Sequence, residues 1–454
     1  MQCFSKVLCF EMSVYWVIGY FLVLALTLIY KTPVVRGPWL FLLRSFFPNW
    51  KFFHAVGYVP HLYARAVQAN KDGELTWSNW EHLYPRTSQS LWQLFHNPET
   101  NLGLAQQNLI DHFWADLNDS PDGCDPRNFV SYQMVAHFVK GLLNKKYPQH
   151  SHYQFELRML LDNPSDTVHT HVMMTSHRQL RHFMTPEWST PYILSTPVAI
   201  RAIEFLFAMC AGIQTLEYWR MRHAMQGDGL WVWSIQRQDI PSPWIRRYLD
   251  GLYTPAMFSA LLLTRFMALI SLAMQGSHLY NIGFLFVSNL AILIRWRGAF
   301  NGGSDFMTLV VLTGLLIAQV VSQLESPELG WRAGFWYITI QSITSYFMSG
   351  SVKLLKREWR DGSAMTIFLN TAIHGPLSSN HWLRQPWLAA ISSWSFILWE
   401  CAAPLALLDA RLALVFCTIA AFFHFLVFWY FGLNRFFWAW IATFPAIVWC
   451  AGQI

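Results

Sequence analysis

The sequence predicts an all-α, multi-pass membrane bundle of about nine spans, with a small α+β domain inserted between spans one and two. Three observations predict it. Of the 454 residues, 54% are apolar and only 13% are charged, which is about half the charged share of a typical soluble domain. The 24 Trp residues suit a bilayer interface, where the indole ring lies in apolar material while its N–H stays hydrated. Apolar stretches of about 20 residues, the length needed to cross a bilayer, recur along the chain.

The expected spans differ in quality. The stretch at 279–294 is short and contains Asn281 and Asn289. The stretch at 14–30 is longer than the apolar core of a signal peptide and is followed by Lys31, so a retained anchor is favoured over a cleaved signal. The nine expected spans are 14–30, 193–217, 254–275, 279–294, 305–323, 333–352, 388–408, 411–430 and 436–453.

Three regions follow from these spans. An anchor occupies 1–30, a more polar α+β domain occupies 31–190, and the remaining bundle occupies 191–454. The start of the middle region, Trp39 to Tyr63, mixes aromatic and basic residues. That composition is typical either of an amphipathic element on the membrane surface or of a core helix.

Periodicity predicts the elements of the polar domain. Apolar residues at helical spacing predict helices over 101–117 and 129–143. The period then changes to two. Alternation over 155–161 and 168–172, on either side of a turn at 162–166, predicts a β-hairpin.

Charge in the connecting segments predicts the orientation. From the second span onward, the segments on one side carry 13 Lys and Arg residues, and those on the other side carry two. The basic side is expected to be cytoplasmic, together with the N-terminus, which leaves 31–190 outside the cytoplasm. In a bacterium the membrane would be the inner (plasma) membrane. The basic segments are 219–253, 295–297, 353–386 and Arg435.

A candidate catalytic motif closes the sixth span. It begins with Tyr346, continues through Gly350 and Lys353, and is followed by Trp359 and Gly362. A glycine permits close approach of another backbone. A lysine that is partly desolvated is more readily an uncharged amine, which can act as a base. The alternative is a lysine that extends to water and anchors the end of the helix.

The pattern Tyr-Phe-x-x-Gly-x-x-Lys, followed by Trp-x-x-Gly, resembles the signature of the HTTM family (horizontally transferred transmembrane helices). These proteins are bacterial relatives of the membrane part of vitamin K-dependent gamma-carboxylase. Other features of the family occur in the same order over about 193–454. They are an arginine in the first helix (Arg201), a polar stretch that opens a middle helix (Asn301 to Asp305), a Glu before a Pro (Glu400) and a late His (His424).

In the carboxylase, the lysine of this motif deprotonates reduced vitamin K. The oxygenated quinone then deprotonates a substrate glutamate, which captures CO₂. The resemblance therefore implies that Lys353 is a catalytic base and that a reduced quinone would be the cofactor. The residues themselves identify no cofactor. Val352 precedes this lysine, whereas the carboxylase has paired lysines.

Charged residues within the spans must face the bundle interior and a partner, because an intramembrane charge costs about 2.5–3.5 kcal/mol on insertion scales. Arg201 and Glu204 are three residues apart and can pair on one helix face. We expect Arg265 to pair with Glu400. These charges indicate either a polar cavity for a ligand or attachment between helices. The polar candidates for binding a cofactor are Arg201, Arg265, Asn301, Asp305, Glu400 and His424.

Other kinds of site find less support. Seven histidines fall between 137 and 182, and His169 and His171 share a strand face that would suit a metal. Solvated strand histidines are the favoured interpretation, and no metal is expected. The scattered cysteines lack zinc-finger spacing, and no run of Lys and Arg indicates nucleic acid.

Three functions are compatible with this sequence. The favoured one is a maturation, assembly or export-linked membrane factor that acts on a partner protein through 31–190. The second is a carboxylase-like membrane enzyme that uses Lys353 and a quinone. The third is a transporter-like or lipid-handling bundle built around Arg265, Glu400 and His424.

Overall fold

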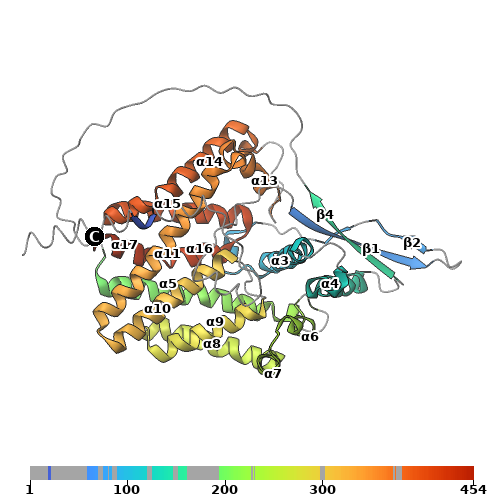
Figure 1. Cartoon of the computed structure of the whole chain (residues 1–454), viewed down its shortest axis with the longest axis horizontal. Coiled ribbons are helices and arrows are strands. Elements are labelled where there is room, and N and C mark those ends of the chain that lie inside the picture. The colour runs from blue at the N-terminus through green and yellow to red at the C-terminus, as the bar shows by residue number, and fades with distance from the viewer. Residues whose placement is uncertain are drawn as a thin grey trace, which may run out of the picture.

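Long helices dominate the computed structural model of the chain, and a smaller α+β domain lies against one end of them (Figure 1). The structure describes residues 19–21, 59–69, 75–79, 81–83, 89–119, 125–146, 152–160, 194–225, 229, 231–296, 302–371, 374 and 381–453.

Four of the described helices are long and apolar enough to cross a membrane, namely α5, α8, α10 and α15. Helix α9 is apolar but shorter, and α11 runs for 29 residues beside α10. The long helices are α5 (Thr196–Arg220), α8 (Pro255–Gln275), α9 (Leu279–Arg295), α10 (Gly302–Leu324), α11 (Pro327–Leu355), α14 (Pro386–Cys401) and α15 (Ala410–Phe431).

Two of the expected spans are interrupted. The stretch 388–408 forms most of α14 and then the 3₁₀ helix η7 (Ala403–Leu408), which has Pro404 in its first turn. The stretch 436–453 divides into α16 (Asn434–Ile441) and α17 (Phe444–Ala451), and Pro445 again follows the break. Proline lacks the N–H that would continue the preceding helix, so each break follows from the sequence.

Of the first expected span, 14–30, the structure describes only residues 19–21, which are helical. Phe21 is buried, and the centroid of its ring lies 5.2 Å from the centroid of the Phe347 ring. The Tyr20 hydroxyl lies 3.1 Å from Thr344 Oγ1. These residues therefore lie against α11, and the retained anchor stays a prediction.

Short helices connect the longer ones. They are η4 (Arg222–Met225), α6 (Trp233–Gln236), η5 (Arg237–Asp239), α7 (Pro243–Leu252), α12 (Arg357–Arg360), α13 (Ser363–Thr371) and η6 (Trp382–Arg384).

Glycines let α10 and α11 pack closely. A Cβ atom at Gly334 would lie 2.5 Å from the carbonyl oxygen of Gly314 and 2.9 Å from Ala318 Cβ. Small residues at a helix contact are the usual way for helices to associate in lipid, where apolar side chains gain little by leaving the solvent.

The polar domain contains an antiparallel sheet and two helices. Strand β1 (Val59–Ala69) is central. It pairs with β4 (His152–Leu160) along one edge, and with β2 (Leu75–Trp77) and β3 (Glu81–His82) along the other. The helices are α3 (Pro98–Asp119) and α4 (Val130–Lys146), and the short 3₁₀ helices are η2 (Leu91–Leu94) and η3 (Pro126–Asn128).

The two predicted helices of this domain are confirmed, and so is a strand over 155–160. Strand β4 pairs with β1, which the sequence did not predict. The predicted second arm, 168–172, lies outside the described residues. The end of the stretch 39–63 is strand rather than helix, because a partner strand far along the chain overrides the local pattern.

The domain and the bundle share one hydrophobic core. Leu109 and Phe113 of α3 belong to the same buried cluster as Tyr218 at the end of α5, Trp231, and Leu249 of α7. The described part of the domain therefore lies at the bundle end that carries the arginine-rich segment 219–253 (Figure 1).

This contact is not included in the predicted orientation, which puts 31–190 and the arginine-rich segments on opposite sides; the side that each of them faces stays a prediction. The prediction assigned sides by alternating the spans along the chain. Helix α5, however, begins at the bundle end away from the domain, since Arg201 donates to Ala273 O near the turn between α8 and α9. A count of spans does not reveal how the domain packs.

We expect alanine at Gly334 to destabilise the protein by about 1–3 kcal/mol, because its methyl group overpacks the contact between α10 and α11. Alanine at Gly283, where no atom lies within 4 Å of the added Cβ, should be neutral or stabilising by up to about 1 kcal/mol. Thermal unfolding in detergent measures both. Equal destabilisation by the two variants would contradict the packing described.

Labelling single cysteines with a membrane-impermeant reagent tests the position of the domain. Cysteines replacing the exposed Gln154 of β4 and Ser234 of α6 should react from the same side of sealed vesicles. A cysteine replacing the exposed Leu324, at the other end of the bundle, should react from the opposite side. Reaction of positions 154 and 234 from opposite sides would show that the domain lies elsewhere.

Candidate functional site

Lys353 and Glu400 form a buried ion pair between α11 and α14. The Lys353 Nζ atom lies 2.7 Å from each carboxylate oxygen of Glu400. Ser349, one turn before the lysine, accepts from Nζ at 3.0 Å and donates to Glu400 at 3.1 Å. Both charged residues are only 2% exposed, so Lys353 does not extend to water.

The other motif residues build the surroundings of this pair. A Cβ at Gly350 would lie 2.7 Å from the backbone nitrogen of Cys401 and from Glu400 Cβ, so glycine is what lets Glu400 approach. The Lys353 ammonium lies 5.2 Å from the centroid of the Trp359 ring, which is close enough for a cation–π attraction. Gly362, with φ +82°, lies against Ala390 of α14.

A buried tyrosine–histidine pair lies on the same face of α11. Tyr346 is two turns before Lys353, and its hydroxyl lies 2.6 Å from His424 Nε2 of α15. The imidazole of His424 stacks on Trp440 of α16, with centroids 5.0 Å apart. The Tyr346 ring also contacts Trp399, the residue before Glu400.

The structure therefore brings together three residues that separate motifs singled out, Lys353, Glu400 and His424. One helix face carries both the amine and the tyrosine, and two further helices supply the carboxylate and the imidazole. Chemically, the cluster can hold a proton on nitrogen or oxygen and can pass it between neighbouring groups. Amine, carboxylate and imidazole are the usual side chains of general acid–base catalysis.

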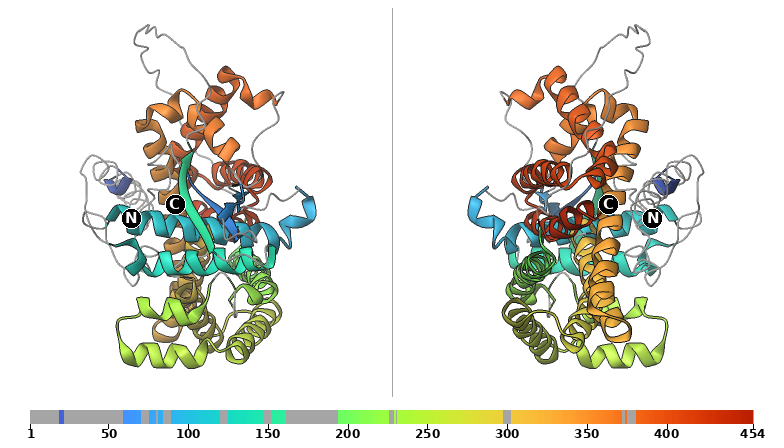
Figure 2. Two further views of the ribbon diagram at one scale, coloured as in Figure 1. Left: turned by 90° about the vertical axis from the view of Figure 1, so that its right-hand side faces the viewer. Right: turned by 90° about the vertical axis from the view of Figure 1, so that its left-hand side faces the viewer.

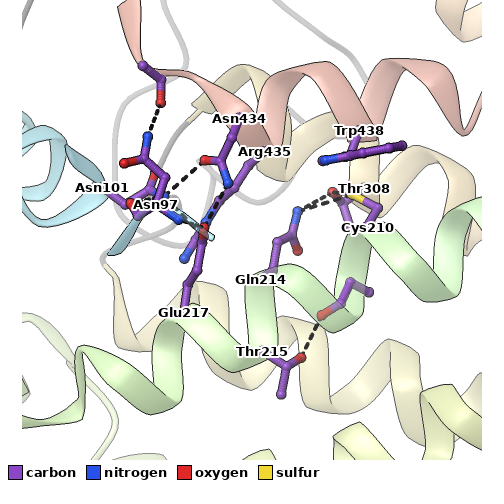
Figure 3. Close-up of polar contacts among 12 residues, drawn as sticks. Asn97, Asn101, Cys210, Gln214, Thr215, Glu217, Thr308, Asn434, Arg435 and Trp438 are labelled. Atoms are coloured by element: carbon purple, nitrogen blue, oxygen red, sulfur yellow. Dashed lines mark hydrogen bonds and ion pairs between the residues drawn. The ribbon is translucent and has the colours of Figure 1, made fainter. Parts of the chain in front are cut away.

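A second buried ionic cluster joins the domain to the bundle (Figure 3). Its centre is Glu217 of α5, whose Oε2 lies 2.5 Å from Arg435 Nε of α16. Asn434 Nδ2 donates to the same carboxylate at 2.7 Å. The domain contributes the Asn97 backbone N–H at 2.9 Å and Asn101 Nδ2 at 3.0 Å. We call these five residues the Glu217 cluster.

Sequence reasoning missed the Glu217 cluster. Glu217 closes an expected span, and Arg435 was counted as a charge of a connecting segment, yet neither side chain is exposed. The Arg435 guanidinium also lies 4.3 Å from the centroid of the Tyr218 ring. The available signal was the sequence Asn434-Arg435 between two apolar stretches, which is where a buried cation would be needed to match an intramembrane Glu.

The predicted pair of Arg265 with Glu400 is wrong. Arg265 is buried on α8 and donates to Thr215 at 3.2 Å, to the Leu285 carbonyl at 3.1 Å, to Ser288 at 2.9 Å and to Asn289 at 3.0 Å. These partners lie on α5 and α9, which pack on α8, whereas α14 packs on α11. The pairing was unpredictable because neutral hydroxyl, amide and carbonyl groups satisfy this arginine.

The remaining candidates lie apart from the Lys353 pair. Arg201 and Glu204 are paired as predicted, at 2.5 Å. The Glu204 carboxylate also accepts from the backbone N–H and the hydroxyl of Ser277, in the turn between α8 and α9. Asp305 is buried in the first turn of α10, where a carboxylate complements the helix dipole. Asn301 lies outside the described residues.

Within the described part of the chain, no group of three or more His, Cys, Asp or Glu residues is placed to hold a metal ion. His169 and His171 lie outside that part.

Comparisons with protein-family models, with curated proteins and with solved structures each find no match to this chain.

Glutamine at Glu217 should loosen the domain from the bundle. It removes the charge that compensates the buried Arg435, and such a loss typically costs about 3–5 kcal/mol. Hydrogen–deuterium exchange should rise at 97–101 and 434–435. Glutamine at Glu325, an exposed residue just after α10, serves as the matched control. Unchanged exchange in the Glu217 variant would show that the cluster does not hold the domain.

Proposed function

We propose that this chain is a multi-pass, HTTM-like membrane protein whose Lys353 site performs carboxylase-like chemistry on a glutamate side chain, with a lipid-soluble reduced quinone as cosubstrate. The observation that supports the proposal is the convergence of the motif residues. Tyr346, Gly350, Lys353 and Trp359 all belong to one buried site with Glu400. A lysine that only anchored the end of a helix would need neither the close glycine contact nor a carboxylate held against it.

The proposed role of Lys353 is that of a base. In a dry site, a proton held between Nζ and the Glu400 carboxylate at 2.7 Å can reside on either atom. With the proton on oxygen, Lys353 is an uncharged amine that can accept a proton from a substrate. Glu400 then acts as the positioning partner of the base, and Ser349 fixes the geometry of the pair. The resemblance gives a reduced quinone as the corresponding substrate.

A second function is favoured by the position of the domain. The Glu217 cluster and the shared core hold α3 firmly on the bundle end. A rigidly held domain suits recognition of a partner protein, because it loses less conformational entropy when it binds. The second proposal is therefore a maturation, assembly or export-linked factor. The transporter-like or lipid-handling alternative stays a prediction; of its three residues, Arg265 lies apart from Glu400.

We further propose that the bundle crosses the membrane nine times, with the interrupted segments α14–η7 and α16–α17 among the spans. The arginine-rich end is then the cytoplasmic end.

Mass spectrometry of glutamate-containing peptides, from cells with and without the gene, tests the enzymatic proposal. We expect a mass increase of one CO₂ that depends on the intact gene and is lost in Lys353→Met. The nearby Lys356→Met should retain the modification. A protein that co-purifies with the natural chain and is lost on changes in the domain, without any added CO₂, would instead support the factor.

A further variant separates loss of chemistry from loss of folding. Lys353→Met alone leaves a buried, uncompensated carboxylate, which costs about 3–5 kcal/mol. The double variant Lys353→Met/Glu400→Gln removes both charges and should regain normal membrane levels without regaining activity. Activity in the folded double variant would rule out Lys353 as the base.

A further inference from the structure

Helix α7 (Pro243–Leu252) lies across the end of the bundle. Figure 1 looks along its axis, while α8 and α10 run across the picture, and the side views show α7 extended at the edge of the bundle (Figure 2). Two residues, Tyr253 and Thr254, separate it from α8. The Tyr253 hydroxyl donates to the Ala291 carbonyl at 2.7 Å and fixes this corner.

The length of α8 sets the depth of α7. Helix α8 has 21 residues and is about 32 Å long at 1.5 Å per residue, close to the roughly 30 Å of hydrocarbon in a bilayer. If α8 crosses the membrane, its first residue lies at one boundary of the hydrocarbon. Helix α7 then lies at that boundary, parallel to the membrane plane.

One side of α7 is held by the protein. Leu249 is buried in the shared core. The Asp250 carboxylate accepts from Arg237 at 2.5 Å and from Trp233 Nε1 at 2.8 Å. The hydrogen bond from Arg237 lowers the pKa of Asp250, so this carboxylate remains charged and paired at neutral pH. The inward side of α7 therefore needs no further partner.

The outward side of α7 is apolar and aromatic. Trp244 is 82% exposed, Tyr248 is 72% exposed, and Ile245 is 43% exposed. These residues, spaced i, i+1 and i+4, form one stripe on the helix. Arg247 is exposed beside the stripe and has no hydrogen-bond partner among the described residues. Exposed Trp and Tyr with a flanking arginine are typical of a helix that lies in the headgroup region of a bilayer.

We propose that α7 is an interfacial helix, with Trp244, Ile245 and Tyr248 inserted at the boundary of the acyl chains and Arg247 bound to the phosphate of an anionic lipid. Lipid is the occupant that the position favours. The adjoining helix α8 exposes apolar side chains such as Met257 and Leu263, and these continue the apolar surface of α7 into the expected span. The arginine adds a preference for anionic headgroups.

Spin labelling of the full chain in nanodiscs tests the insertion. In a cysteine-free background, a nitroxide at Tyr248→Cys should be more accessible to oxygen than to a water-soluble nickel chelate. A nitroxide at Ser234→Cys, on the exposed side of α6, should show the reverse. Full access of the chelate to position 248 would overturn the proposal, and so would exclusion of both reagents, which would indicate a covering protein.

The headgroup preference has its own test. In nanodiscs that contain phosphatidylglycerol and phosphatidylcholine, Arg247→Gln should lower the unfolding temperature, whereas Arg247→Lys should keep most of the stabilisation. In pure phosphatidylcholine the three proteins should unfold together. Removal of one arginine near an anionic surface corresponds to about a fivefold loss in lipid affinity. An unfolding temperature of Arg247→Gln equal to the natural protein in both lipids would exclude a bound phosphate.

Discussion

The constraint on which this structure depends is that a charge buried among apolar helices must have a compensating group within reach. Leaving one buried charge without its partner costs several kcal/mol, so each buried charge determines which helices can be neighbours. Glu217 requires Arg435, and that requirement brings the end of α5 to the start of α16. Lys353 requires Glu400 and brings α11 to α14. Arg265 achieves the same for α5, α8 and α9 with neutral acceptors alone.

Small residues make these pairings geometrically attainable. Gly350 removes the side chain that would otherwise keep Glu400 away from the lysine. Gly334 allows contact with α10 through the carbonyl oxygen of Gly314. Charge specifies the partner of each helix, whereas the absence of a Cβ sets the distance. The motif that ends in Lys353 combines both requirements within eight residues, which explains why it could be recognised as a unit.

Apolar length and helical period were enough to predict most of the helices, and the motif predicted the residues around Lys353. The pairing of charges was harder to predict, because it depends on which helices are neighbours in space. The orientation also depends on which charges are buried, and it stays a prediction. A count of basic residues assumes that each is hydrated, whereas Lys353, Arg295 and Arg435 are each at most 2% exposed. Strand β1 was missed because its partner β4 lies far along the chain.

Helix α16 belongs to both buried clusters. Its first turn carries Arg435, bound by Glu217, and its last turn carries Trp440, stacked on His424. Eight residues of helix span about 12 Å. The helix is interrupted directly afterwards, at Ala442–Thr443. Helix α16 is therefore a short rigid segment, and it ends at an interruption of the helix. Any tilt of the domain at Asn97 and Asn101 would therefore reach the imidazole beside Tyr346 as a mechanical displacement.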